Sequence, residues 1–148
     1  MDPDRIEREI EIAAPPERVW EALTTAEHLG TWFGDAGATI DLRPGGELVC
    51  RWERHGTVRA VIEVVEPVTR FRFRWAGPLG EEPVAGNTTT VEFTLAPTAQ
   101  GTKLRVVETG FTDLQVPPDA RRRYRQGNVG GWREELDELR GHLVGARG

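Results

Sequence analysis

The 148-residue sequence has one cysteine, Cys50, one lysine, Lys103, and no apolar run near the roughly 18 residues that span a bilayer. A lone cysteine excludes an intrachain disulfide and a cysteine-rich metal site. The charged start, Met1 to Arg5, is not followed by an apolar signal core, so we expect a cytoplasmic protein without membrane insertion. The other 18 basic residues are arginine, which we interpret as GC-rich codon usage and a bacterial origin.

Motifs that would mark catalysis are also missing. The sequence has no Gly-x-Ser-x-Gly elbow, Walker loop or Gly-x-Gly-x-x-Gly fingerprint. Its three histidines, His28, His55 and His142, lack metal-site spacing, and surface or capping roles are expected for them. A net charge of −5 argues against nucleic acid as a partner. We therefore predict no catalytic residue, no metal and no cofactor.

Hydrophobic periodicity predicts an α+β fold. The length suits one domain spanning residues 1–148. Two short helices are expected after the first strand, and a long helix is expected at the C-terminus. Alternating apolar residues predict strands at 5–12, 36–41, 47–53, 57–66, 68–75, 90–95 and 102–107.

The predicted strands form an antiparallel meander with one dry face and one wet face. In strand 57–66 the dry face should carry Val58, Ala60, Ile62 and Val64. Strand 68–75 alternates three aromatic residues with three arginines, and the arginines should pair across strands with acids such as Glu92. These six residues are Phe71, Phe73 and Trp75 against Arg70, Arg72 and Arg74.

Local sequence signals predict where the two short helices begin and where two turns lie. Pro15 and Pro16 suit the start of the first short helix. Thr24 and Glu27 have capping-box spacing, so a second helix should begin there and stop near Gly34. The segment Arg43-Pro44-Gly45-Gly46 is typical of a turn, and His55-Gly56 suits a hairpin.

Only the C-terminal helix is long enough to cover the dry face of the sheet. It opens at Pro117-Pro118-Asp119. Gly127, Gly130 and Gly131 each cost about 1 kcal/mol relative to alanine in a helix, so they indicate either close backbone packing or space left for a guest. Its inward stripe should be Tyr124, Asn128, Trp132, Leu136, Leu139, Leu143 and Ala146.

Aromatic residues dominate the candidate binding site, although core packing also explains buried tryptophans. Trp20 and Trp132 are interpreted as structural. Arg51, Arg54 and Arg59 are polar groups that either reach the interior or stay outside, and the sequence leaves this open. The residues expected to line a ligand site are Trp32, Trp52, Phe73, Trp75, Phe93, Tyr124 and Asn128.

Three segments resemble one known family. Residues 10–24, followed by Leu29-Gly30-Thr31-Trp32-Phe33, resemble the opening of activator of Hsp90 ATPase homologue-like proteins. Arg43-Pro44-Gly45-Gly46 resembles their glycine turn, and Gly131-Trp132 with the leucines that follow resembles their C-terminal helix. The resemblance covers roughly residues 5–145. The family belongs to the START-related (SRPBCC) helix-grip superfamily.

The resemblance implies a helix-grip fold, in which a curved antiparallel sheet wraps around the long helix and leaves a hydrophobic cavity. Relatives include lipid and hormone carriers, cyclases and aromatases, and co-chaperones that stimulate Hsp90 in the stress response. We therefore expect a carrier, sensor or sequestering protein for a small apolar molecule, as a monomer or homodimer. An enzyme of the cyclase or hydrolase type, with Arg51, Arg59 and Tyr124 as candidates, and a module that binds a protein partner are the alternatives.

Overall fold

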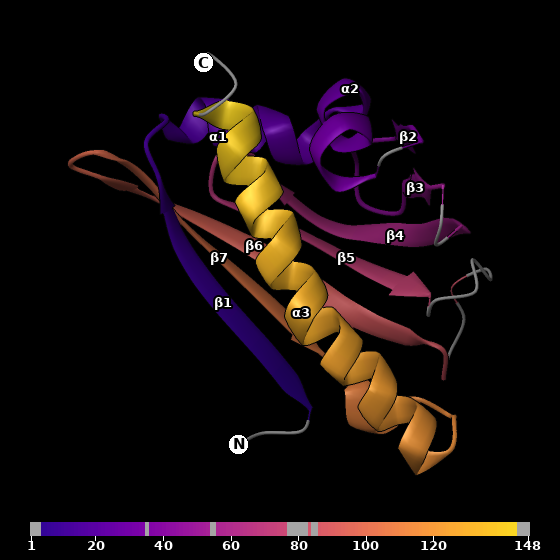
Figure 1. Ribbon diagram of the computed structural model, residues 1–148. Coiled ribbons are helices and arrows are strands. Elements are labelled where there is room, and N and C mark those ends of the chain that lie inside the picture. Colours follow the sequence, from indigo (N-terminus) through magenta and orange to yellow (C-terminus); the bar gives the residue numbers. More distant parts are fainter. Residues whose placement is uncertain (1–3, 35, 54–55, 77–82, 84–85, 145–148) are drawn as a thin grey trace.

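A computed structural model describes residues 4–34, 36–53, 56–76, 83 and 86–144. Its centre is a curved seven-stranded antiparallel sheet in the order β1-β7-β6-β5-β4-β3-β2, crossed by one long helix (Figure 1). The α+β helix-grip prediction is confirmed. The strands are β1 (Arg5–Ile12), β2 (Ala38–Ile40), β3 (Glu47–Trp52), β4 (Gly56–Glu66), β5 (Arg70–Ala76), β6 (Thr88–Thr98) and β7 (Gly101–Thr109). The helical segments are α1 (Pro16–Thr24), α2 (Ala26–His28), η1 (Leu29–Phe33), η2 (Phe111–Asp113) and α3 (Pro118–Leu143).

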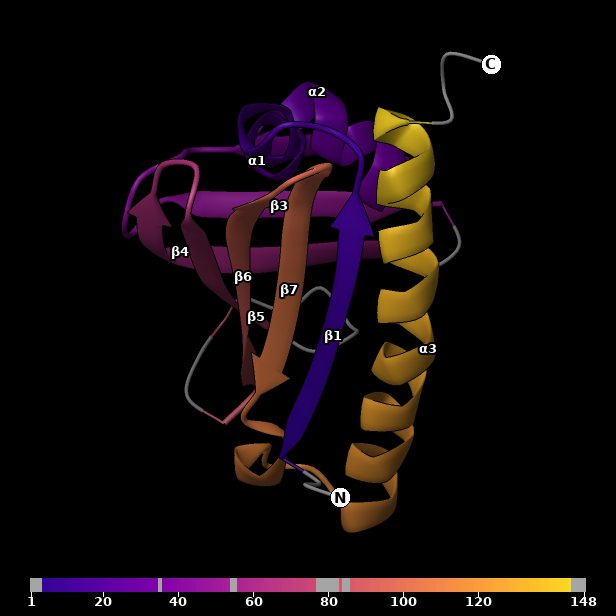
Figure 2. The same cartoon turned by 90° about the vertical axis from the view of Figure 1, so that its left-hand side faces the viewer.

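The sheet bends so strongly that β3 and β4 run across the direction of β1 and β7 (Figure 2). The first strand pairs with the last, since β1 lies antiparallel to β7 from Arg5 opposite Thr109 to Ile12 opposite Thr102. Segments distant in sequence are thereby joined in one sheet. Helices α1 and α2 lie at one end of the sheet, near the C-terminal end of α3.

The two short helices differ in one respect from the prediction. Pro16 does open α1, and Val19 and Leu23 are buried. The prediction of a capping box is wrong, because the Thr24 hydroxyl donates to the Trp20 carbonyl oxygen at 2.8 Å. Both threonines at this junction bond backward into α1, as their short side chains often do. The second helix is consequently a short α2 that continues as the π-turn η1 and ends before Gly34.

A β-bulge in β4 places Val64 on the opposite face of the sheet from the one predicted. Register shifts between Ile62 and Val64, so that Val65, not Val64, pairs with Phe71 and packs against the core. An extra residue on one strand changes the phase of side-chain alternation, and no sequence periodicity reports it. Glu63, at the bulge, pairs on the outer face with Arg72 and Arg74.

The wet face of the sheet confirms the predicted arginine row. Arg70 lies 3.7 Å and Arg72 lies 3.5 Å from Glu92, and Arg70 also pairs with Glu66 at 3.1 Å. These are exposed or half-exposed pairs, which contribute little stability each. Their main effect is to keep the outer face polar. The predicted turn at residues 43–46 is also formed, and at Gly46 a Cβ atom would collide with the Asp41 carbonyl oxygen.

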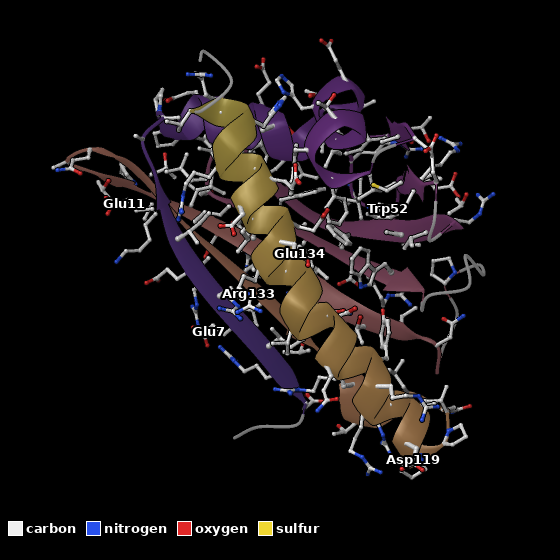
Figure 3. The ribbon with its side chains drawn as sticks, in the orientation of Figure 1. Glu7, Glu11, Trp52, Asp119, Arg133 and Glu134 are labelled. Atoms are coloured by element: carbon white, nitrogen blue, oxygen red, sulfur yellow. The ribbon has the colours of Figure 1, made fainter. Side chains whose placement is uncertain are left out.

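Helix α3 begins after Pro117 and presents the expected leucines to the sheet. Leu136, Leu139 and Leu143 are buried, whereas Arg133 and Glu134 are exposed (Figure 3). Among the described helices, none combines the length and the apolar character needed to cross a lipid bilayer. Predictions for Ala146, Arg54, His55 and most of the 77–87 loop fall outside the described residues.

Candidate functional site

A buried carboxylate that the sequence analysis missed holds α3 against the sheet. Glu108, near the end of β7, has no solvent exposure. Its Oε1 accepts from Trp132 Nε1 at 2.8 Å and from Asn128 Nδ2 at 3.0 Å, both on α3. Its Oε2 accepts from Trp75 Nε1 at 3.0 Å and from the Thr89 hydroxyl at 2.5 Å. These four donors come from β5, β6 and α3 and surround Glu108, and we call these five residues the Glu108 clamp.

Burial and hydrogen bonding act on Glu108 in opposite directions. Burial raises the pKa of its carboxyl, and the bonds from Thr89, Trp132, Trp75 and Asn128 counteract part of this rise. Nearby, burial raises the pKa of the Tyr124 hydroxyl, and the negative charge of Glu108 raises it further. Such perturbed groups concentrate at functional sites.

The position of Glu108 could have been read from the alternation of β7. Thr102, Leu104 and Val106 are all buried and point to the same face, and the next residue in phase is Glu108. The predicted strand ended at residue 107, two positions before the end of β7 and just before Glu108. A charged residue was not expected inside, because an unpaired buried charge is too costly. Only the tertiary contacts supply its partners.

Aromatic rings in mutual contact lie around the clamp, and we call six of them the aromatic cluster. Phe33 is central: its ring centroid is 5.1 Å from that of Trp52 and 5.9 Å from that of Trp75. Trp75 also stacks on Trp132 with centroids 5.8 Å apart. The cluster consists of Phe33, Trp52, Phe73, Trp75, Phe93 and Trp132.

The structure brings six of the seven predicted lining residues to this region. Phe73 and Phe93 are fully buried in the cluster, while Trp52 and Trp75 face inward but remain half-buried. Asn128 belongs to the Glu108 clamp, and Tyr124 contacts Phe111 at a centroid distance of 5.8 Å. The seventh residue, Trp32, touches the cluster through Phe33 and donates its indole N–H to the Ala22 carbonyl oxygen at 2.7 Å. Trp132, interpreted from the sequence as structural, is a member of the clamp.

The helix glycines do not pack closely against the sheet. A Cβ atom added at Gly127, Gly130 or Gly131 would meet no atom of the described residues within 4 Å, so close packing against the described sheet does not explain these glycines. At 100° per residue, Gly127 and Gly131 lie on the same flank of α3 as Tyr124. We call Gly127 and Gly131 the glycine flank. Gly130 points away from the buried stripe, almost opposite Trp132.

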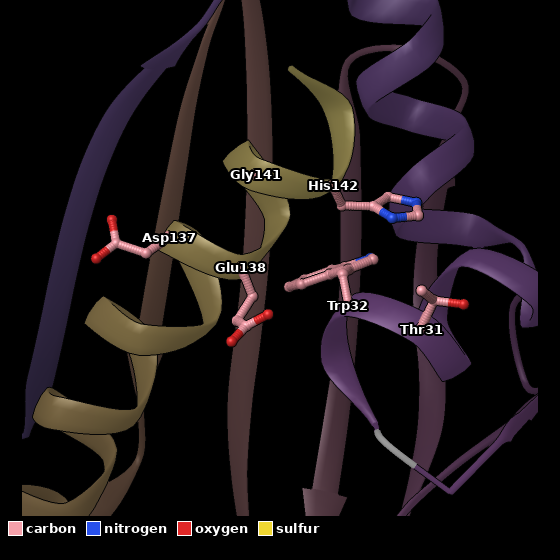
Figure 4. A pocket seen from close by; sticks show the side chains of 6 residues that line it. All are labelled: Thr31, Trp32, Asp137, Glu138, Gly141 and His142. Carbon is pink, nitrogen blue, oxygen red and sulfur yellow. The ribbon is translucent and has the colours of Figure 1, made fainter. Parts of the chain in front are cut away.

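An open groove of about 350 Å³ lies between η1 and the end of α3 (Figure 4). Beside it, His28 Nδ1 and His142 Nε2 are 2.7 Å apart, and His28 Nε2 lies 3.5 Å from Glu21. These histidines were expected to be surface or capping residues, and instead they tie α2 to α3. The groove is lined by Thr31, Trp32, Asp137, Glu138, Gly141 and His142.

Other candidate polar groups are placed away from the cluster. Arg51 is exposed, and Arg59 pairs with Glu47 at 3.1 Å on the outside. Cys50 is buried as expected, and burial with the nearby Glu135 raises the pKa of its thiol to about 12. Such a thiol is unreactive at neutral pH. In the part of the chain that is described, no three His, Cys, Asp or Glu side chains are grouped to hold a metal ion.

Sequence comparison identifies the family. The profile of the Activator of Hsp90 ATPase homolog 1-like protein family matches residues 13–143. The chain belongs to this family. No curated protein is significantly similar in sequence.

Solved structures agree with this activator of Hsp90 ATPase homolog 1-like assignment. Protein MLL2253 from Mesorhizobium loti is 27% identical, with a TM-score of 0.77, and the match covers 96% of this chain and 97% of that one. DynU16, a protein of the dynemicin biosynthetic locus, is 25% identical with a TM-score of 0.75, covering 95% of this chain and 47% of that one. The Aha1 dimer from Colwellia psychrerythraea, at 21% identity and a TM-score of 0.74, covers 94% and 95% and shares the fold.

Proposed function

We propose that the chain binds a small apolar or aromatic molecule between the glycine flank of α3 and the inward-facing rings of Trp52 and Trp75. The observation that carries the proposal is the open space at Gly131, which is next to Trp132 on α3, the ring that stacks on Trp75. Trp52 and Trp75 point to the concave side of the sheet yet stay half-buried. Among the described residues, none would lie within 4 Å of a Cβ atom at Gly127, which is exposed, or at Gly131, which is half-buried. Empty space beside large rings is typical of a ligand site.

The aromatic cluster supplies the affinity in this proposal. Burying about 150 Å² of apolar ligand surface contributes ~4 kcal/mol before ordering costs. Offset and edge-to-face ring contacts, of the kind already present around Phe33, add to this. Tyr124 and Asn128 would orient the polar end of the ligand. The role is that of a cytoplasmic carrier, sensor or sequestering protein.

The two other hypotheses draw less support from the described residues. An enzyme acting at the aromatic cluster would need a free acid or base there, but Glu108 is saturated by four donors and Arg51 and Arg59 lie outside. Burial raises the pKa of the third candidate, Tyr124, which makes it a weaker acid. A protein-interaction module that used the arginine row would have to compete with its pairing to Glu63, Glu66 and Glu92.

A titration with N-phenyl-1-naphthylamine, a neutral dye that fluoresces in apolar sites, tests the proposal. We expect saturable binding to the wild-type chain and at least tenfold weaker binding to Gly131→Leu, which fills the flank. Gly130→Leu is the matched control, because it makes the same change about 100° around α3 from Gly131, on the side turned away from the buried stripe. Equal dye binding by all three proteins, or by none of them, would rule out a ligand site at the glycine flank.

A further inference from the structure

We propose that two copies of the chain associate through the outer faces of their α3 helices, which pack antiparallel about a two-fold axis. This contact does not depend on the proposed ligand, because it uses the face of α3 that points away from the sheet. The residues that carry it form one outward row, which we call the α3 stripe: Arg123, Gly127, Gly130 and Glu134.

The α3 stripe is uncovered. At 100° per residue, all four of its members lie within about 40° of the direction opposite the buried Trp132. Arg123, Gly127 and Glu134 are exposed, and Gly130 is half-buried. A Cβ atom at either glycine would meet no atom of the other described elements within 4 Å, and no described segment crosses the outer face of α3 in Figure 1. The stripe is therefore free to meet another molecule.

The order of residues in the α3 stripe makes it complementary to itself when its direction is reversed. Its four members are separated by four, three and four positions, so the spacing is the same from either end. A two-fold axis between positions 128 and 129 sets Arg123 opposite Glu134 of the partner subunit and Gly127 opposite Gly130 of the partner subunit. Each ion pair then occurs twice, as in any isologous contact, and the assembly closes at two subunits.

The two glycines permit a close crossing at the centre of this contact. Helix axes usually lie roughly 8–10 Å apart, and the side chains at the crossing set the distance. Without Cβ atoms at Gly127 and Gly130, the two backbones can approach to the lower end of this range. Glycine weakens the interior of an isolated helix, so a close crossing gives both residues a reason to be there.

The charges of α3 favour the same arrangement. Four arginines lie within residues 121–125 and four acidic residues within residues 134–138. Arg121 and Arg125 are four positions apart, as are Glu134 and Glu138, and like charges at this spacing destabilise a helix. Within the described residues, Arg123 and Glu134 form no ion pair. In an antiparallel pair each basic half faces an acidic half, which relieves this repulsion and makes the contact specific.

Sedimentation equilibrium of the full chain at about 10 µM to 1 mM tests the contact. One helix pair buries less than the roughly 800 Å² per partner of a standard interface, so we expect a weak, reversible dimer. Arg123→Glu and Glu134→Arg should each weaken it at least tenfold, because like charges then face each other. The double variant that combines these two changes should recover the wild-type dissociation constant within threefold.

An exposed charge reversal away from the stripe is the matched control. Arg140→Glu lies about 100° around α3 from Arg123 and should leave the dissociation constant unchanged. A monomeric wild type throughout the concentration range would overturn the proposed contact. So would a dimer that the single reversals leave unchanged, or one that the double variant fails to restore.

Gly130→Leu tests the crossing without a change of charge. A leucine there should weaken the dimer at least tenfold by keeping the helices apart, while dye binding is retained. The two proposals therefore fail separately. A monomeric wild type that binds the dye would refute the α3 contact alone, and a dimer that binds no dye would refute the ligand site alone.

Discussion

Glu108 has the most demanding environment of the residues described here. Its carboxyl group accepts hydrogen bonds from two tryptophans, an asparagine and a threonine without access to water. A buried group of this kind is retained only when its partners are all in place. It therefore makes the position of α3 over the sheet specific, which nonpolar packing alone achieves less strictly.

Replacing Glu108 by alanine should destabilise the protein strongly. Four buried donors would lose their acceptor, and we expect the free energy of unfolding to fall by about 3 kcal/mol or more. Urea unfolding followed by tryptophan fluorescence measures the change. Glu92→Ala on the wet face is the control, for which we expect about 0.5 kcal/mol. A small effect at Glu108 would mean that water or a rearranged network replaces the carboxyl.

Val68 is strained in the turn between β4 and β5. Its φ of +69° lies in the left-handed region, which β-branched residues rarely adopt. Val68→Gly should raise the free energy of unfolding by about 0.5–1 kcal/mol, since relief of strain exceeds the entropic cost of glycine. Val68→Ala keeps the Cβ atom and serves as the control. A loss of stability in Val68→Gly would show that side-chain contacts of Val68 outweigh the strain.

At the scale of elements, two histidines join the N-terminal helices to the last helix. His28 and His142 share one hydrogen bond at 2.7 Å, so one ring nitrogen must donate and the other must accept. A fully protonated pair cannot keep this contact. Glu21 lies on the His28 side of the pair, and Arg18 donates to the Leu143 carbonyl oxygen at 3.2 Å.

The contact between α2 and α3 should weaken in acid. Partial burial lowers the pKa of His142 below its usual 6.5, with smaller contributions from His28 and Arg18. The unfolded chain then binds the proton more tightly, so the stability from His142 is present above pH 6.5 and is lost as the pH falls through the folded pKa. We expect the unfolding free energy of wild type to decline over this range.

The variant His142→Gln should show a smaller decline, because it cannot take up the proton. Chemical denaturation at a series of pH values between 5 and 8 gives both profiles. Parallel profiles for the two proteins would show that His142 does not control this contact.

For the whole molecule, the pairing of β1 with β7 predicts cooperative unfolding. The sheet joins its first and last strands, and α3 is held to β5, β6 and β7 through Glu108. A single domain over residues 1–148 remains a prediction, and it requires one unfolding transition. Far-ultraviolet circular dichroism and tryptophan fluorescence should give the same midpoint in urea. Separate midpoints for helix and sheet signals would contradict it.

The sequence by itself determined the order of the elements and the two faces of the sheet. Period-two alternation in β5 and β6 and the leucine stripe of α3 depend on local spacing, which is readable without coordinates. The family resemblance drawn from the opening segment was confirmed by the profile match. Three aromatic residues of the cluster were found for the same reason, since Phe73, Trp75 and Phe93 follow the alternation, whereas Phe33, at the end of η1, was not predicted as a site residue.

Only the tertiary structure decided which face one strand residue takes and which partners the buried and half-buried polar groups have. The bulge at Glu63 reversed the face of Val64, the two histidines met across more than a hundred residues, and Glu108 found donors on three other elements. Each of these depends on contacts between segments distant in sequence, for which periodicity carries no signal. A buried carboxylate in particular is excluded by local rules until its partners are known, because its cost is removed only by groups that the fold brings together.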